Sequence, residues 1–226
     1  MDRIENEKKR VAQESLTYVK NGMVVGLGSG STAEHMIRKL GKKIATGLTI
    51  TGVASSEKTA NLARDFGIPL TGLDQVTMLD INIDGADEFD PNLQLIKGGG
   101  GALLKEKILA HNSKLNIIIA DSSKKVDKLG KFKLPIEVIP FAHGSIMAQL
   151  HAQALKPVLR SVNGITYRTD ENNFIIDIDV LAYEDLGKLN TALLKTPGVV
   201  ETGLFLESTD ILIVGNGEET TTLNKR

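Results

Sequence analysis

Hydrophobic and polar positions in the first half of the chain alternate between two spacings. Residues 5–20 carry Ala12, Leu16 and Val19 at the spacing of one helix face, and Asn21-Gly22 ends that pattern. The short apolar run at 24–27 then has the continuous pattern of a buried strand. Because strand-like and helix-like segments continue to alternate, the pattern predicts an α/β domain with a mostly parallel sheet.

The remaining segments of this first half are assigned in the same way. A helix is expected directly after residue 30, where apolar positions again recur at helical spacing. Further elements are expected as strands at 48–56, 78–89, 92–97 and 115–121 and as a helix at 55–67.

The pattern changes after about residue 130, where strands are bounded by prolines and tight turns. We expect a strand at 133–140, a helix at 142–155, a hairpin joining 165–170 to 173–180, a helix at 184–195 and a strand at 199–207. This order suggests a small α+β unit of the ferredoxin-like, split βαβ kind. The apolar run at 211–217 is expected to return to the first sheet.

The predicted fold is therefore a Rossmann-like, three-layer α/β domain with a small inserted α+β domain. Residues 1–130 and 208–226 would form the catalytic domain, and residues 131–207 the smaller domain, which we expect to take part in oligomer contacts.

Composition excludes several classes of function. The 226 residues carry a net charge of −1 from 27 basic and 28 acidic side chains, without a dense basic block, which argues against nucleic acid as a partner. Cysteine is absent, so disulfides and thiolate chemistry are excluded. The N-terminal segment MDRIENEKKR has no apolar core, and no apolar run approaches the ~20 residues of a membrane helix. A cytoplasmic location, with no membrane partner, is the expectation.

The loop GLGSGSTA, residues 26–33, has three interpretations. As a dinucleotide loop it lacks the third glycine, because Ser31 stands there, and as a P-loop it lacks the Gly-Lys-Ser/Thr ending. As a phosphate cradle it would offer backbone N–H groups and hydroxyls of Ser29–Thr32 at a helix N-terminus. A tight turn with a Ser/Thr cap explains the same letters equally well, so both remain open for this loop alone.

Two acidic and lysine-bearing segments follow later strands. DGADE, residues 84–88, places Asp84 and Asp87 around a turn; solvated turn carboxylates are the plainer alternative, and the spacing does not fit a calcium loop. DSSKK, residues 121–125, repeats the strand, acid, hydroxyl and lysine order. The four histidines show no metal or triad spacing, so no metal site is predicted.

The segment IKGGGGALLKEKILA raises the question of why four glycines separate a strand from a helix. A glycine run after Lys97 would let backbone approach a polar ligand closely. Glu106 lies a helical turn from Leu103 and Ala110, so an inward face would make it a partly buried carboxylate and a usable base. A surface glutamate between two lysines is the alternative.

The recurrence of similar polar residues at four strand ends favours one binding site over four unrelated turns. Each of the four strand ends carries hydroxyl, carboxylate, lysine or glycine and no large apolar side chain. Because strand ends of a parallel sheet converge on one edge, we expect them to form a site for a small, phosphorylated, oxygen-rich molecule.

The motifs GLGSGST, DGADE, KGGGGALLKEK and ADSSK, in this order, resemble those of ribose-5-phosphate isomerase, type A. The resemblance spans nearly the whole chain, including the IEVIP strand and PGVVETGLF. It implies Glu106, Asp84 and Lys97 as catalytic residues, and Lys8 stands where the family has a lysine near the phosphate. The implied substrate contacts are Ser29, Gly30, Ser31, Thr32, Asp84, Gly85, Ala86, Asp87, Lys97, Gly98, Gly99, Gly100 and Lys124.

The resemblance also implies an activity in the non-oxidative pentose phosphate pathway. D-ribose 5-phosphate and D-ribulose 5-phosphate would be interconverted through a cis-enediolate, with no cofactor and with a homodimer or homotetramer as the assembly. A non-catalytic sugar-phosphate sensor is the alternative, although residues 1–22 are too short for the DNA-binding helices that such sensors usually carry. A nucleotide-dependent dehydrogenase is a more distant alternative, weakened by the failed dinucleotide motif.

Overall fold

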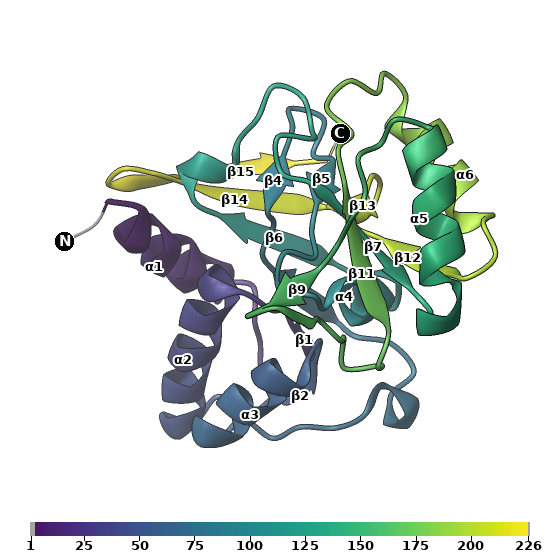
Figure 1. The fold of residues 1–226 in the computed structure, drawn as a ribbon. Coiled ribbons are helices and arrows are strands. Elements are labelled where there is room, and N and C mark those ends of the chain that lie inside the picture. The colour runs from purple at the N-terminus through teal and green to yellow at the C-terminus, as the bar shows by residue number, and fades with distance from the viewer. Residues whose placement is uncertain (1–2, 226) are drawn as a thin grey trace. The chain divides into compact units, whose positions relative to one another are not determined.

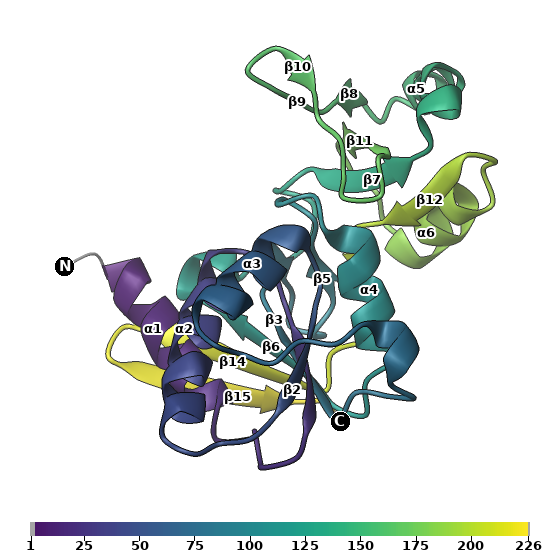
Figure 2. The same cartoon turned by 90° about the horizontal axis from the view of Figure 1, so that it is seen from below.

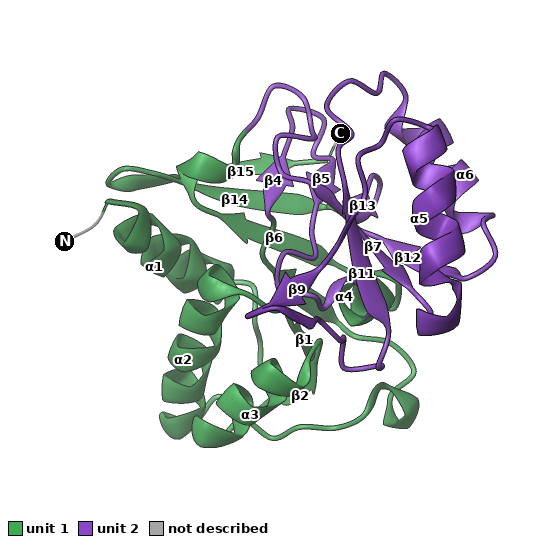
Figure 3. Cartoon of the chain, viewed as in Figure 1, with its two compact units in different colours: residues 1–86, 105–125, 208–226 green, residues 87–104, 126–207 purple. Residues whose placement is uncertain are grey.

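A computed structural model describes residues 3–225 and divides the chain into two compact units (Figure 3). Unit 1 comprises Met1–Ala86, Lys105–Lys125 and Ser208–Arg226, and unit 2 comprises Asp87–Leu104 and Val126–Glu207. The division into domains at 1–130 with 208–226 and at 131–207 stays a prediction.

Unit 1 is built on a six-stranded sheet in the order β15-β14-β6-β3-β1-β2 (Figure 1). All neighbouring strands are parallel except β15, which pairs antiparallel with β14. The expected return of the chain to this sheet is confirmed, because β14 pairs with β6. The strands are β1 (Val24–Leu27), β2 (Thr51–Ala54), β3 (Ile81–Asp84), β6 (Asn116–Ala120), β14 (Ile211–Asn216) and β15 (Glu219–Asn224).

Helices cover both faces of this sheet and make the predicted three layers (Figure 2). The larger core joins α1 and α2 to one face of the sheet, and Leu109 of α4 packs with Val53 and Leu79 on the other. No described helix has both the length and the apolar composition needed to cross a membrane. The helices are α1 (Arg3–Ser15), α2 (Ser31–Ala45), α3 (Glu57–Asp65) and α4 (Leu103–His111).

The first helix ends earlier than its apolar spacing predicts. The prediction ran to residue 20, whereas α1 stops at Ser15. Leu16 and Val19 are still buried, so the apolar pattern continues after the helical hydrogen bonds end. The hydroxyl of Thr17 donates to the carbonyl of Glu14 at 2.8 Å and satisfies one of the terminal carbonyls.

Unit 2 contains a four-stranded antiparallel sheet in the order β12-β7-β11-β8 with two helices. Its chain order is strand, helix, strand, strand, helix, strand, so the predicted split βαβ arrangement is confirmed. The elements are β7 (Leu134–Val138), α5 (His143–Ala152), β8 (Val158–Leu159), β11 (Phe174–Ile178), α6 (Leu186–Leu194) and β12 (Val199–Thr202).

The expected long strand at 78–89 is wrong, because the chain turns between two different sheets. β3 ends at Asp84, and β4 (Glu88–Phe89) pairs instead with β5 (Leu95–Ile96) in a separate antiparallel sheet completed by β13 (Leu204–Phe205). The strand before the glycine run therefore does not belong to the parallel sheet. Of the four strand ends expected to converge, those of β1, β3 and β6 therefore do so, and the one before the glycine run does not.

The expected hairpin between 165–170 and 173–180 is also wrong. β10 (Ile165–Thr166) pairs with β9 (Ser161–Val162), and β11 pairs with β7 and β8. The turn between β9 and β10 is Asn163-Gly164, with φ of 52° and 78°. Asn-Gly with two positive φ values is the preferred two-residue hairpin turn, a signal that the sequence carries.

Candidate active site

The ends of β1 and β3 form the centre of the site in unit 1. The chain leaves β1 to one side and reaches β3 on the other, and ligands of open α/β sheets bind outside such a reversal. The N–H groups of Ser29 and Gly85 donate to Oδ1 of Asp84 at 3.0 and 2.7 Å. Asp84 is 1% exposed, so these bonds hold a buried carboxylate in a fixed orientation.

A cluster of hydroxyls lies behind the first loop. Oγ of Ser29 is 2.8 Å from Oγ of Ser55, 2.8 Å from Oγ of Ser56 and 3.1 Å from Oγ1 of Thr59. The Thr59 hydroxyl also donates to the carbonyl of Gly28 at 3.0 Å. Ser29 therefore anchors the loop through both its backbone and its side chain, and its contact with a ligand stays a prediction.

The next residues of this loop begin helix α2. Gly30 is the N-cap, with a φ of 97°, and it has no side chain to cap the helix. The first-turn N–H groups of Ser31 and Thr32 therefore lie at the positive end of a 15-residue helix. This geometry suits an anion, as the cradle interpretation requires.

Glu106 lies on the buried face of α4. It is 5% exposed, and Leu103 and Leu109 on the same face are 0% and 3% exposed. The expectation that this face is inward is confirmed, and the alternative of a surface glutamate is wrong. The catalytic role of Glu106 stays a prediction.

The glycine run, which lies in unit 2, follows a buried lysine. Lys97 is 3% exposed, its Nζ lies 5.4 Å from the centre of the Phe205 ring, and its N–H donates to the carbonyl of Gly203 at 2.9 Å. The N–H of Gly99 donates to Oδ2 of Asp87 at 2.7 Å. Asp87 therefore fixes the glycine run rather than standing as a solvated turn residue.

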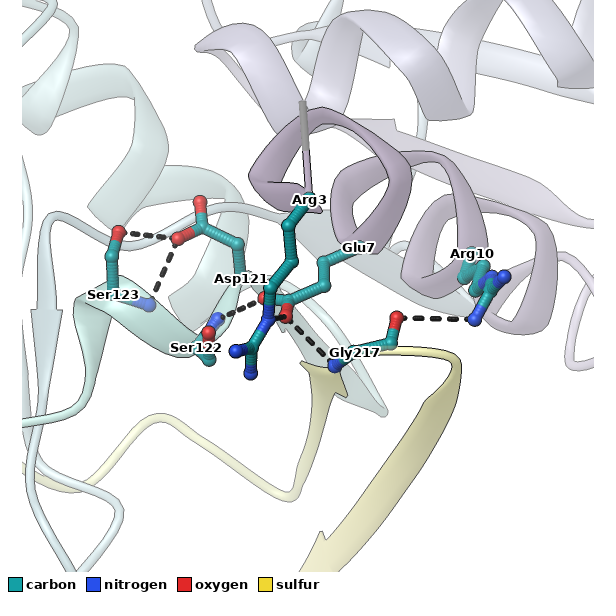
Figure 4. A network of polar contacts seen from close by, with 7 residues as sticks. All are labelled: Arg3, Glu7, Arg10, Asp121, Ser122, Ser123 and Gly217. Atoms are coloured by element: carbon teal, nitrogen blue, oxygen red, sulfur yellow. Dashed lines mark hydrogen bonds and ion pairs between the residues drawn. The ribbon is translucent and has the colours of Figure 1, made fainter. Parts of the chain in front are cut away.

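A buried carboxylate of α1 holds the turn that contains Lys124 (Figure 4). This turn is the 3-10 helix η2 (Ser122–Lys124). Glu7 is 0% exposed and accepts hydrogen bonds from the N–H of Ser122 at 2.8 Å, the N–H of Gly217 at 2.8 Å and Nε of Arg3 at 3.0 Å. Burial alone would raise the pKa of Glu7, but these bonds outweigh it and lower the pKa from 4.5 to about 2.

Glu7→Gln is expected to destabilise the protein by about 3 kcal/mol at pH 7, because a pKa lowered from 4.5 to about 2 corresponds to that free energy. The folded-state pKa is the lower one, so the contribution is fully present above about pH 4.5 and is lost as the pH falls toward 2. Urea unfolding of both proteins from pH 7 downward measures the difference, which should shrink below about pH 4.

Glu14 provides the matched control on the same helix. It accepts hydrogen bonds from the hydroxyls of Thr220 and Thr222 and does not hold η2. We expect Glu14→Gln to cost about 1 kcal/mol, in the range of an ordinary hydrogen bond. Equal losses for the two variants, or a Glu7→Gln difference that grows as the pH falls, would contradict the assignment.

Within each unit, the structure brings some of the predicted site residues into contact. Unit 1 brings Ser29, Asp84 and Gly85 into direct contact, and unit 2 does the same for Asp87 and Gly99. Lys8 of α1 has its Nζ 3.9 Å from a carboxylate oxygen of Glu5. The anchoring residues Glu7, Ser55, Ser56 and Thr59 were not predicted from the sequence.

Comparison with known proteins gives consistent matches over most of the chain. The family profile of ribose 5-phosphate isomerase A (phosphoriboisomerase A) matches residues 51–219. Ribose-5-phosphate isomerase A of Parvibaculum lavamentivorans is 48% identical over 223 residues, covering 96% of this chain and 96% of that protein. That of Jannaschia sp. is 46% identical over 225 residues, covering 96% of this chain and 86% of that protein.

Solved structures agree in both fold and extent. A D-ribose-5-phosphate isomerase in complex with phospho-erythronic acid has a TM-score of 0.95 and 41% identity, covering 99% of this chain and 100% of that chain. Ribose 5-phosphate isomerase A from Methanocaldococcus jannaschii has a TM-score of 0.93 and 40% identity, covering 98% and 99%. The resemblance noted in the motifs is confirmed, and the chain belongs to the ribose 5-phosphate isomerase A family.

Proposed function

We propose that this chain interconverts D-ribose 5-phosphate and D-ribulose 5-phosphate by proton transfer through a cis-enediolate, with Glu106 as the base. As a member of its family it is an enzyme, an isomerase of the pentose phosphate pathway. The observation that carries the mechanism is the burial of Glu106 on α4, one turn after the glycine run. A positioned carboxylate of this kind is suited to removing a proton next to a carbonyl.

The proposed reaction moves protons only within the sugar and between the sugar and Glu106, and it consumes no other reagent. Once the sugar ring has opened, Glu106 takes the proton from C2, the C2–H electron pair forms the C1=C2 bond, and the carbonyl π pair moves to the C1 oxygen. A proton then passes from the C2 oxygen to the C1 oxygen. Protonated Glu106 returns its proton to C1, which leaves the carbonyl at C2 and the base regenerated.

The other predicted residues receive roles that fit their local geometry. The N-terminus of α2 at Ser31 and Thr32 suits the phosphate, and Lys124 adds positive charge. Asp84, held by two backbone N–H groups, would assist ring opening. Lys97 and the amides of the glycine run would stabilise the negative charge of the enediolate.

Turnover by the purified chain tests this proposal. D-ribose 5-phosphate is supplied in the presence of a chelator and without any nucleotide, and ketose formation is followed. Rapid conversion is expected. If the chain binds D-ribose 5-phosphate without converting it, the isomerase proposal fails in favour of a sugar-phosphate sensor.

We also propose that the chain forms homo-oligomers through its smaller unit. Exposed apolar side chains gather in unit 2, where Phe141 is 98% exposed, Ile165 75% and Val162 54%. Large apolar side chains exposed to this degree are typical of residues in a protein interface. Light scattering of the purified chain at micromolar concentration measures the mass, and the mass of a single chain would contradict the proposal.

A further inference from the structure

Two residues of unit 2 hold the carbonyl groups of the glycine run, and a third residue holds one of those two in place. Nη1 of Arg160 donates to the carbonyl of Gly98 at 2.8 Å and to that of Gly99 at 3.2 Å. The Tyr167 hydroxyl donates to the carbonyl of Gly100 at 3.2 Å. Arg160 is itself fixed by a bidentate ion pair with Asp177, in which Nε–Oδ2 is 2.9 Å and Nη2–Oδ1 is 2.5 Å. We call Arg160, Asp177 and Tyr167 the loop clamp.

The clamp is rigid because both of its donors stand at the base of one hairpin. Arg160 and Tyr167 flank β9 and β10, and the N–H of Tyr167 donates to the carbonyl of Arg160 at 2.9 Å. The N–H of Arg160 donates in turn to the carbonyl of Ile175 in β11 at 2.8 Å. The side chains of Arg160 and Asp177 are only 14% and 18% exposed, so solvent competes weakly for this pair.

Holding a carbonyl also orients the next N–H group. In a trans peptide the C=O and N–H groups point in opposite directions, and the described peptides of this run are trans. With the Gly98 carbonyl on Arg160, the N–H of Gly99 points away and meets Asp87 at 2.7 Å. With the Gly99 carbonyl on Arg160, the N–H of Gly100 likewise points away from the clamp.

Gly100 differs from its neighbours in what surrounds it. Within the described residues its N–H has no hydrogen-bond acceptor, whereas the N–H of Gly101 donates to the carbonyl of Gly98 at 3.0 Å. A Cβ built at Gly100 would meet nothing within 4 Å. An exposed, oriented N–H with open space beside it is a donor prepared for a ligand oxygen.

We propose that Arg160 is a positioning residue, which with Asp177 and Tyr167 presents the N–H of Gly100 to an oxygen of the enediolate. This inference rests on the proposed function. The clamp does not touch the sugar; it acts by fixing peptide planes before the substrate arrives. A donor that needs no reorganisation stabilises the charge that develops in the reaction more than it stabilises bound substrate.

The test compares Arg160→Met with Arg168→Met. Arg168 is the matched control, because it also donates to a backbone carbonyl, that of Asn172 at 2.9 Å, and also lies over a ring, that of Phe174 at 4.8 Å. We expect Arg160→Met to lower kcat about 10²-fold, as loss of one preorganised donor does, with less than about threefold change in KM. Arg168→Met should leave both constants unchanged.

Inhibition constants show whether Arg160→Met affects only the position of the Gly100 N–H or disturbs the whole site. Phospho-erythronic acid carries a carboxylate that mimics the charged oxygens of the enediolate, whereas inorganic phosphate probes only the phosphate site. We expect Arg160→Met to raise the inhibition constant of phospho-erythronic acid about tenfold or more. The inhibition constant of inorganic phosphate should rise less than about twofold. An equal rise in both constants, or unchanged kcat, would overturn the proposal.

Two further variants keep the test valid if Arg160→Met fails to fold. Tyr167→Phe and Asp177→Asn each remove one bond of the clamp and preserve its volume. In both variants the inhibition constant of phospho-erythronic acid should rise more than that of inorganic phosphate, although by less than in Arg160→Met. Equal changes in the two inhibition constants would overturn the proposal. Failure of the proposed function is distinguishable, because the unaltered chain would then not isomerise the sugar at all.

Discussion

Glu106→Gln is expected to lower kcat about 10²–10⁴-fold while substrate is still bound, because an amide cannot accept the C2 proton. The substitution keeps the shape of a side chain that is 5% exposed, so the packing of α4 should be retained. Steady-state kinetics with D-ribose 5-phosphate give kcat and KM. Exchange of the C2 hydrogen with solvent deuterium reports the proton transfer itself and should fall in parallel.

Two controls make this result specific. Glu14→Gln removes one carboxylate from α1, in the same unit, and should leave kcat unchanged. Inhibition of Glu106→Gln by phospho-erythronic acid shows whether the site is still assembled. If Glu106→Gln isomerises at the rate of the unaltered chain, the enzyme assignment stands and another residue is the base. If exchange persists while isomerisation stops, Glu106 returns the proton but does not remove it.

Gly28→Ala is expected to abolish measurable activity and to destabilise the protein by about 1–3 kcal/mol or more. A Cβ at this position would lie 2.1 Å from Oδ1, 2.3 Å from Cγ and 2.5 Å from Cα of Asp84. Rotating the Asp84 side chain cannot relieve a contact with its Cα, so the ends of β1 and β3 must separate. Thermal unfolding and kcat/KM, measured on the same preparation, would show both losses.

Gly144→Ala is the control for glycine substitution as such. Gly144 lies in the first turn of α5, and a Cβ there would meet nothing within 4 Å. This variant should be neutral or more stable by about 0.4–1 kcal/mol, because alanine has fewer unfolded conformations. A Gly28→Ala protein with the stability and activity of Gly144→Ala would show that β1 and β3 do not need this close approach.

Local patterns predicted the parts of the site that depend on short-range order. The run at 24–27 is β1, the helix after residue 30 is α2, and the spacing of Leu103, Glu106 and Ala110 identifies a buried helix face. Each of these depends on periodicity over a few residues, which a single sequence displays directly.

Patterns failed where the chain changes sheets within a few residues. The alternation of apolar and polar residues at 78–89 continues across Gly85 and therefore predicts one strand, yet β3 and β4 belong to different sheets. The prediction failed because side-chain alternation does not say which partner a strand pairs with. Asn82 and Asp84 are buried together with Ile81 and Ile83, so this strand is enclosed on both faces.

The residues that anchor the site could not be predicted from the sequence for a related reason. Glu7 stands in the charged segment NEKKR and has the appearance of a solvated helix residue, whereas its two backbone partners lie 115 and 210 positions away. Arg160 is likewise 62 positions from Gly98. Hydrogen bonds over such separations leave no local spacing to detect, so only coordinates reveal them.

The bonds of Glu7 have a consequence for synthesis of the chain on the ribosome. α1 precedes unit 2 in the chain, but the N–H of Gly217 that Glu7 requires follows unit 2, as do β14 and β15. Until then the carboxylate of Glu7 lacks the N–H of Gly217, and α1 lacks the part of its packing that β14 and β15 provide. The second unit, by contrast, has most of its residues in one continuous stretch, Val126–Glu207, and its sheet is complete earlier. A chain that ends at Glu207 and has been released from the ribosome should therefore protect the β7–β12 sheet from protease while α1 is still cleaved.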